Sequence, residues 1–154
     1  MRKYNILQMM KSVVGNLSGE YVARLKRRAL SFLKEAEEAA DADLAAFFAE
    51  QAMQLYLKAV FYELFGDRIR GHSLRELLGV LSKSLEKHGY TKLVGEIRDL
   101  VDEHRSWLIL AEEAYIGGRY GDTSYTRDDV EKLIEVARSL IMVLDRVVNR
   151  VKLG

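Results

Sequence analysis

The sequence contains neither cysteine nor proline. The absence of cysteine excludes disulfide bonds, thiolate nucleophiles and cysteine zinc sites, and it fits the reducing cytoplasm, where we expect the protein. The absence of proline removes the strongest helix breaker, so long uninterrupted helices are permitted. The chain also lacks any run of about 18 uninterrupted apolar residues, which predicts that no helix spans a membrane.

Length, composition and charge favour a single soluble domain over residues 1–154, with residues 1–18 as an N-terminal extension. The chain has 154 residues, of which 49% are hydrophobic and 31% are charged. This length is sufficient for one hydrophobic core. The net charge of +1 gives no general attraction to nucleic acid. The basic run of Arg24, Lys26, Arg27 and Arg28 is either a solvated helix face or a contact for RNA phosphates or an acidic partner.

Apolar residues repeat at helical spacing along the chain, and no segment alternates as a strand does. We therefore predict an all-α fold, an up-and-down bundle of about five helices. The first long helix is expected from about Gly19 to Ala40, with Ser18 as its N-cap, and residues 4–14 are expected to form a short extra helix. The second is expected from about Ala42 to Phe65. It is apolar nearly all round, which predicts that it is the central helix.

Polar and glycine residues mark the helix ends. Asp41 or Asp43 is expected to start the central helix, and Gly66 to stop it. A capping box at Ser73 predicts the start of a third helix, which ends near His88 and Gly89. Thr91 is expected to cap a fourth helix that ends near Gly117 and Gly118. Thr126, with Asp129 in the place of the usual glutamate, predicts the start of the last helix.

Three segments carry a resemblance to a known family. They are Glu50-Gln51-Ala52-Met53-Gln54-Leu55-Tyr56-Leu57-Lys58-Ala59, His72-Ser73-Leu74 and Arg119-Tyr120-Gly121-Asp122-Thr123-Ser124-Tyr125. Together they resemble the HEPN family of small α-helical domains, over a span from about Ala23 to Val148. The family is known for RNases, for toxins of toxin–antitoxin pairs and for partners of minimal nucleotidyltransferases. The resemblance implies a HEPN-like bundle that forms a homodimer and belongs to a toxin–antitoxin-like pair.

The segment that starts at Arg119 departs from the family's catalytic pattern. Many HEPN RNases use an arginine followed by four to six residues and a histidine, which handles a ribose hydroxyl proton while the arginine stabilises phosphate charge. Here Ser124, Tyr125 and Thr126 stand where that histidine would fall, and none of them titrates near neutral pH. The remaining Arg-Tyr-Gly-Asp resembles the Arg-Tyr-Pro-Asp variant of archaeal and thermophilic members, which are often encoded beside a nucleotidyltransferase.

The candidate site combines this segment with the polar residues of the central helix. The candidate ligand-binding residues are Arg119, Tyr120, Asp122, Lys58 and Gln51. The candidates for a catalytic role are Arg119, His72 and Tyr125. No cofactor is expected, and no metal either, because the row of Glu96, Asp99 and Glu103 is typical of a solvated helix face.

Each candidate also has a purely structural interpretation. Tyr125 would pack on Val130 as a hydrophobic staple, and Arg119 would bind carbonyl groups at the end of the fourth helix. Lys58 would be held by loop carbonyls or by Asp122, because a lysine on an apolar helix needs partners. His72 would pack beside the helix cap that follows it.

The leading functional hypothesis is a homodimeric HEPN module that binds a nucleotide, an RNA or a nucleotidyltransferase partner. One alternative is a metal-independent endoribonuclease toxin with a degenerate arginine–histidine motif. The other is an interaction module that has no nucleotide site.

Overall fold

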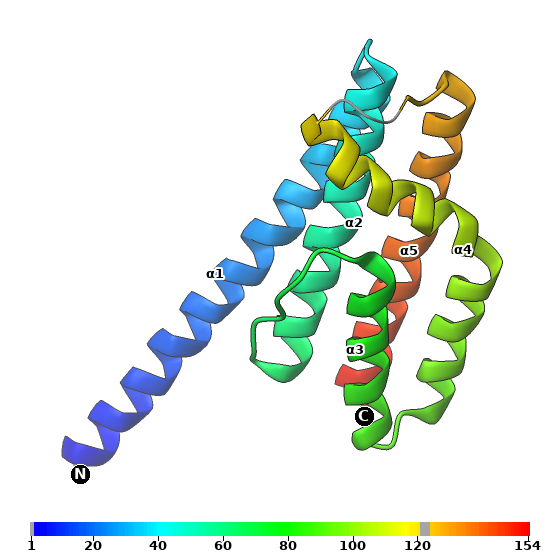
Figure 1. The fold of residues 1–154 in the computed structure, drawn as a ribbon. Coiled ribbons are helices and arrows are strands. Elements are labelled where there is room, and N and C mark those ends of the chain that lie inside the picture. Colours follow the sequence, from blue (N-terminus) through cyan, green and yellow to red (C-terminus); the bar gives the residue numbers. More distant parts are fainter. Residues whose placement is uncertain (1, 121–123) are drawn as a thin grey trace.

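The protein is all-helical, as the periodicity of the sequence predicts. The computed structural model describes residues 2–120 and 124–154, with the backbone alone for 2–5, 7, 8, 10–16 and 118–120. Over these residues the chain forms five helices and no strand. They are α1 (Arg2–Glu38), α2 (Ala42–Phe65), α3 (Leu74–Lys87), α4 (Thr91–Tyr120) and α5 (Arg127–Leu153) (Figure 1).

Helix α2 is the centre of the bundle, which confirms the prediction made from its apolar composition. It contacts all four other helices. Helix α1 runs beside it, and the C-terminal half of α4 crosses it near its first turns (Figure 1). Small side chains allow the neighbouring helices to approach closely. Ala45, Ala46, Ala49 and Ala52 are completely buried.

The two ends of α2 lie where the sequence predicts them. Asp41 is the N-cap, and its carboxylate accepts a hydrogen bond of 3.0 Å from the backbone N–H of Leu44. Gly66 ends the helix in the left-handed conformation, with φ of 68°, and its N–H donates to the carbonyl of Tyr62 at 2.8 Å. Glycine adopts this conformation without the steric cost that other residues incur, so both boundaries are encoded locally.

The start of α5 is also encoded locally. The predicted capping box is complete: the N–H of Thr126 donates to Asp129 at 3.0 Å, and the N–H of Asp129 donates to the Thr126 hydroxyl at 3.1 Å. At the start of α3, the Ser73 hydroxyl accepts a hydrogen bond of 3.4 Å from the N–H of Glu76. Helix α3 ends at Lys87, just before the predicted end at His88 and Gly89.

The first helix is much longer than we predicted. Helix α1 is continuous from Arg2, so the separate helix over residues 4–14 and the N-cap at Ser18 are both wrong. Ser18 lies inside α1, where its hydroxyl is 3.5 Å from that of Tyr62. Glycine and serine favour helix ends but do not force them, and no proline interrupts this stretch. As a result, the N-terminal part of α1 projects beyond the bundle (Figure 1).

Helix α4 differs from the prediction at both ends. Thr91 is its first residue rather than its cap, and the carbonyl of Tyr90 accepts from the N–H of Val94 at 3.2 Å. The helix continues past Gly117 and Gly118 to Tyr120. It also bends at His104, where φ is −115° and ψ is 16°. The bend lets the first half of α4 pack on α3 while the second half crosses α2 (Figure 1).

The contrast between two neighbouring side chains on α5 tests this packing. Leu144 is completely buried, whereas the side chain of Met142 is 62% exposed. We expect Leu144→Ala to lower the free energy of unfolding by about 2–5 kcal/mol, because it leaves a cavity in the core. The matched Met142→Ala should lower it by less than about 0.5 kcal/mol. Urea unfolding of both variants measures the difference, and equal losses would contradict the placement of α5.

Candidate functional site

The polar residues of one face of α2 form a connected chain, which we call the α2 polar strip: Glu50, Gln51, Gln54 and Lys58. The Glu50 side chain is completely buried. Its carboxylate accepts hydrogen bonds from the side-chain amides of Gln51 and Gln54, both at 2.8 Å. The Gln54 carbonyl in turn accepts from the Lys58 ammonium at 3.2 Å. A buried carboxylate therefore has partners on both of its oxygens, as its burial requires.

Burial shifts the pKa of both charged residues of the strip, Glu50 and Lys58. It raises the pKa of Glu50 to about 7, although the two glutamine hydrogen bonds and the Lys58 charge act in the opposite direction. The charge of Glu112 on α4 adds to the increase. Burial also lowers the pKa of Lys58, partly offset by the charge of Glu50. Glu50 is thus poised to change its protonation near neutral pH, but it is closed off from solvent.

Glu112 connects α4 to the start of α3. Its carboxylate accepts from the Ser73 hydroxyl at 2.6 Å and from the backbone N–H of Arg75 at 3.2 Å. The Nε of Arg75 donates to it at 2.8 Å. A carboxylate is favoured here because the N-terminus of a helix presents free N–H groups and a positive dipole end. Ser73 therefore has a second role as a donor to Glu112, beyond the capping predicted from the sequence.

Three flat rings stack between α2, α4 and the segment that precedes α3. The ring of His72 lies 4.7 Å from that of Tyr115, with an interplanar angle of 17°. Tyr115 stacks in the same orientation on Phe47, at 6.4 Å and 17°. His72 is the exposed end of this stack. Tyr115 precedes Arg119 by four residues, about one helical turn, in α4.

Tyr125 is held in the core by two hydrogen bonds. Its side chain is 6% exposed, and it belongs to the same buried cluster as Val130. Its hydroxyl donates to the carbonyl of Leu110 at 2.9 Å, and its backbone N–H donates to the Asp43 carboxylate at 2.8 Å. Burial raises the pKa of the hydroxyl well above its ordinary value. This geometry favours the structural interpretation of Tyr125, although the partners are polar groups as well as the expected apolar contact.

The remaining predicted residues are only partly covered by the structure. Asp122 lies outside the described residues, as do the side chains of Arg119 and Tyr120. The predicted pairing of Lys58 with Asp122 therefore stays a prediction. The described partner of Lys58 is Gln54. The structure thus brings Gln51 and Lys58 together through the strip, and His72 to Tyr115 on the helix that carries Arg119.

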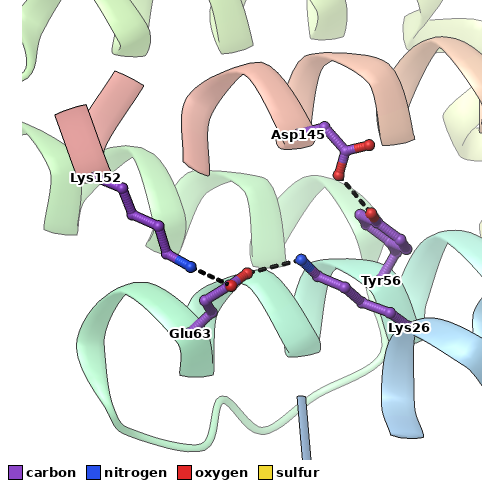
Figure 2. Close-up of polar contacts among 5 residues, drawn as sticks. All are labelled: Lys26, Tyr56, Glu63, Asp145 and Lys152. Carbon is purple, nitrogen blue, oxygen red and sulfur yellow. Dashed lines mark hydrogen bonds and ion pairs between the residues drawn. The ribbon is translucent and has the colours of Figure 1, made fainter. Parts of the chain in front are cut away.

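A second polar cluster, which the sequence analysis missed, lies where α1, α2 and α5 meet (Figure 2). Glu63 accepts from Lys26 and from Lys152, both at 2.7 Å. The Tyr56 hydroxyl donates to Asp145, and burial together with this bond raises its pKa. Burial would raise the pKa of Glu63, but the hydrogen bonds from Lys152 and Lys26 outweigh burial and lower it.

The only sequence signal for the second cluster was the presence of polar residues on a nearly apolar helix. Glu63 was visible in this way, but its partners lie 37 and 89 residues away in the chain. No helical spacing connects them. The cluster also accounts for Lys26 in the basic run, whereas Arg24, Arg27 and Arg28 are exposed.

Metal and membrane sites find no support in the described part of the chain. Within it, no group of three or more histidine, aspartate or glutamate side chains is arranged to hold a metal ion. This includes the row of Glu96, Asp99 and Glu103. None of its helices combines the length and the apolar character that a bilayer crossing would need.

Comparison with known proteins identifies one family. The family model of the HEPN domain matches residues 22–147. This range begins within α1 and ends near the end of α5, and it includes both polar clusters except Lys152. Neither the curated proteins nor the solved structures gave a significant match.

The pKa of Glu50 leads to a prediction about stability. The group binds a proton more tightly in the folded state, so its contribution is fully present below pH 4.5 and is lost as the pH rises to about 7. A shift of this size corresponds to roughly 3 kcal/mol. We expect Glu50→Gln to remove this fall in the free energy of unfolding, measured in urea between pH 4 and pH 8. The exposed Glu35→Gln is the control, and the same pH dependence in wild type and Glu50→Gln would refute the prediction.

Proposed function

Because this chain belongs to the HEPN domain family, we propose that it is a binding module for RNA or a nucleotide. The binding surface would lie around the exposed ring of His72 and the C-terminal end of α4, which carries Arg119. The observation that carries this proposal is the ring stack, in which His72 is exposed and lies flat on Tyr115 at 4.7 Å.

The ring stack supports recognition of an unpaired base. Proteins that bind single-stranded RNA stack bases on aromatic or histidine rings, and such stacking tolerates any base because every base has a flat face. His72 is supported from beneath by Tyr115, and Tyr115 by Phe47. A ring that is already stacked loses little freedom when a ligand binds, which favours affinity.

The charges around the stack support recognition of phosphate. Arg119 follows Tyr115 by four residues in α4, and the family resemblance assigns an arginine at this position to phosphate. A guanidinium is suited to this role because it is always charged and binds two oxygens together. Arg75 lies in the first turn of α3, three residues after His72, but Glu112 partly neutralises it. Arg119 is therefore the main candidate for the phosphate contact.

Endoribonuclease activity is the alternative function. His72 favours it, because an exposed imidazole one residue before the α3 cap can exchange a proton with a bound ribose. Glu50 does not favour it, despite a pKa near 7, because its side chain is completely buried and both carboxylate oxygens are occupied. Cleavage of RNA in the presence of a chelator would favour this alternative over simple binding.

The partner expected from the resemblance is a minimal nucleotidyltransferase. This partner, the role in a toxin–antitoxin pair and the cytoplasmic location all stay predictions. Co-expression of this chain with a nucleotidyltransferase encoded beside it, followed by purification through one component, would test the pairing.

Replacing Arg119 tests the phosphate contact. We expect Arg119→Ala to weaken binding of single-stranded RNA by at least about tenfold, roughly 1.4 kcal/mol, because one charge-assisted contact is lost. It should also reduce the salt dependence of binding by about one phosphate contact. The control is Arg105→Ala, an exposed arginine on the same helix that pairs with Asp102. Unchanged affinity after Arg119→Ala would return this arginine to a structural role.

Replacing His72 tests the stacking contact. We expect His72→Ala to cost about 1–3 kcal/mol in the binding of single-stranded RNA, measured by fluorescence anisotropy. His88→Ala is a matched control, because His88 is another exposed histidine beside a helix end that packs on an aromatic ring, 5.3 Å from Phe65. Equal losses in the two variants would contradict a specific role of His72.

A further inference from the structure

A cavity of about 620 Å³ opens beside the second polar cluster, where α1, α2 and the end of α5 meet. We call it the junction cavity. It is lined by one face of α1 from Ser18 to Lys26, by the end of α2 and by Lys152 of α5. Its volume lies within the range of about 300–1,000 Å³ that is usual for small-molecule sites. Its lining differs from the ring stack, and Ser18, Gly19 and Lys152 lie outside the range that matches the HEPN family.

Gly19 makes room for this cavity. A glycine inside a helix lowers its stability, because glycine loses more conformational freedom on folding than any other residue. Gly19 lies inside α1, and its φ is not positive, so the backbone does not require a glycine here. Apart from the backbone around it, no described atom lies within 4 Å of the position that a Cβ on Gly19 would take. The glycine therefore weakens α1 and keeps the space beside it open.

The walls of the junction cavity are mainly apolar. Val22 and Ala23 line it from α1, and Tyr62 lines it from α2. The Tyr62 ring is held by Tyr21, which packs against it edge-on with 4.8 Å between the ring centres. The Tyr62 hydroxyl also lies 3.5 Å from the hydroxyl of Ser18. Apolar walls favour an apolar ligand, and a ring that is already held loses little freedom when a ligand packs on it.

The charged groups of the junction cavity favour an anion. Glu63 lies between Lys26 and Lys152, and each ammonium donates to it at 2.7 Å (Figure 2). Burial alone would raise the pKa of Glu63, but the hydrogen bonds from the two lysines lower it, so the group is ionised at neutral pH. Two positive charges and one negative charge leave an excess of positive charge. Each ammonium has three N–H donors and uses one of them for Glu63, so donors remain for a second anion.

We propose that the junction cavity binds a small organic acid, which has an apolar body and one carboxylate or phosphate group. The apolar body lies against Val22, Ala23 and the ring of Tyr62. The anionic group accepts hydrogen bonds from Lys26 and Lys152, which it shares with Glu63. A molecule with only one of these parts fits less well. An inorganic anion leaves the apolar walls in water, and a neutral apolar molecule leaves the remaining lysine donors unused.

The two lysines differ in how freely they reach the anion. The side chain of Lys152 is 58% exposed and belongs to the last turn of α5, so it can turn from Glu63 towards a ligand without disturbing the core. The side chain of Lys26 is 25% exposed, and its ammonium lies 5.6 Å from the centre of the Tyr56 ring. A contact of this kind attracts the cation and holds Lys26 in place. The cavity therefore has one fixed cation and one movable cation.

Titration of the full chain with naphthalene derivatives tests the class of ligand. Naphthoate and naphthyl phosphate have the same apolar body and different anionic groups, so their affinities decide between a carboxylate and a phosphate. We expect saturable binding of at least one of them by isothermal titration calorimetry. Neutral naphthalenemethanol should bind at least about tenfold more weakly, because it lacks the charge-assisted contact. Equal binding of the neutral compound, or no saturable binding of either anion at millimolar concentration, would overturn the proposal.

Filling the cavity tests the position of the site. Gly19→Leu places a side chain in the open space and raises helix propensity, so α1 should stay folded. We expect this variant to lose the binding of the naphthyl anions without a lower unfolding midpoint. Gly79→Leu is the matched control, because Gly79 is another exposed helical glycine with open space beside it, but it belongs to α3. Unchanged affinity after Gly19→Leu would exclude the junction cavity as the site.

Glu63→Gln separates a binding role of the two lysines from a purely structural one. It removes the charge that competes with the ligand for both ammonium groups, so the affinity for the naphthyl anion should rise at least roughly threefold, the size of one screened charge contact. Glu37→Gln is the control, because Glu37 pairs with Arg138 near the other end of α1 and should leave the affinity unchanged. If the lysines only hold Glu63, Glu63→Gln will lower the unfolding midpoint without raising the affinity, and that result would refute the proposal.

Discussion

The fold depends on one helix whose surface is almost entirely apolar. A helix of this kind is stable in water only when it is covered on every side, and α2 contacts each of the other four helices. Completely buried alanines along it let these neighbours approach closely. The order of the helices and the bend in α4 both allow the other helices to cover α2. Without the bend at His104, one straight helix would not pack both on α3 and across α2.

The few polar groups of α2 have to be paired because water is excluded from around them. They form two sets on different faces of the helix. Glu50 and its glutamine neighbours lie on the side of α4, whose Glu112 influences the pKa of Glu50. Tyr56 and Glu63 pair with side chains of α1 and α5 (Figure 2). Hydrogen bonds are directional, whereas apolar contacts are not. These two sets of polar residues therefore set the position and rotation of the helices that pack on the otherwise apolar surface of α2.

How well the sequence predicts each feature depends on how local its cause is. The ends of α2 were predicted closely, with Asp41 or Asp43 as the start and Gly66 as the stop, because such residues act on backbone groups within one turn. The start of α1 was missed because a serine beside a glycine is compatible with a helix end but does not require one. The bend at His104 has no residue signal of the usual kinds, since no proline is present.

In the candidate site, too, the features with a local cause could be predicted, and those that depend on distant parts of the chain could not. Gln51 and Lys58 could be identified because a polar residue on an apolar helix is conspicuous in any sequence. The position of His72 on Tyr115 could not, since it depends on the path of the chain between α2 and α3 and on the bend of α4. The partners of Tyr56 and Glu63 on α5 are 89 residues away, beyond the reach of any periodicity argument.

The contacts of α5 also have a consequence for the order in which the protein folds. Asp145 and Lys152 reach α2 across 89 residues, Arg127 reaches the carbonyl of Ala39 across 88, and Arg138 reaches Glu37 across 101. Forming contacts between residues so far apart in the chain requires a large loss of loop-closure entropy. The contacts between α1 and α2 require a smaller loss, because a short turn joins these helices. We therefore expect the α1–α2 hairpin to form early, which leaves one side of α2 uncovered until α5 docks. Because α5 is synthesised after the other four helices, α2, the most apolar helix, lacks part of its cover until α5 has emerged and docked.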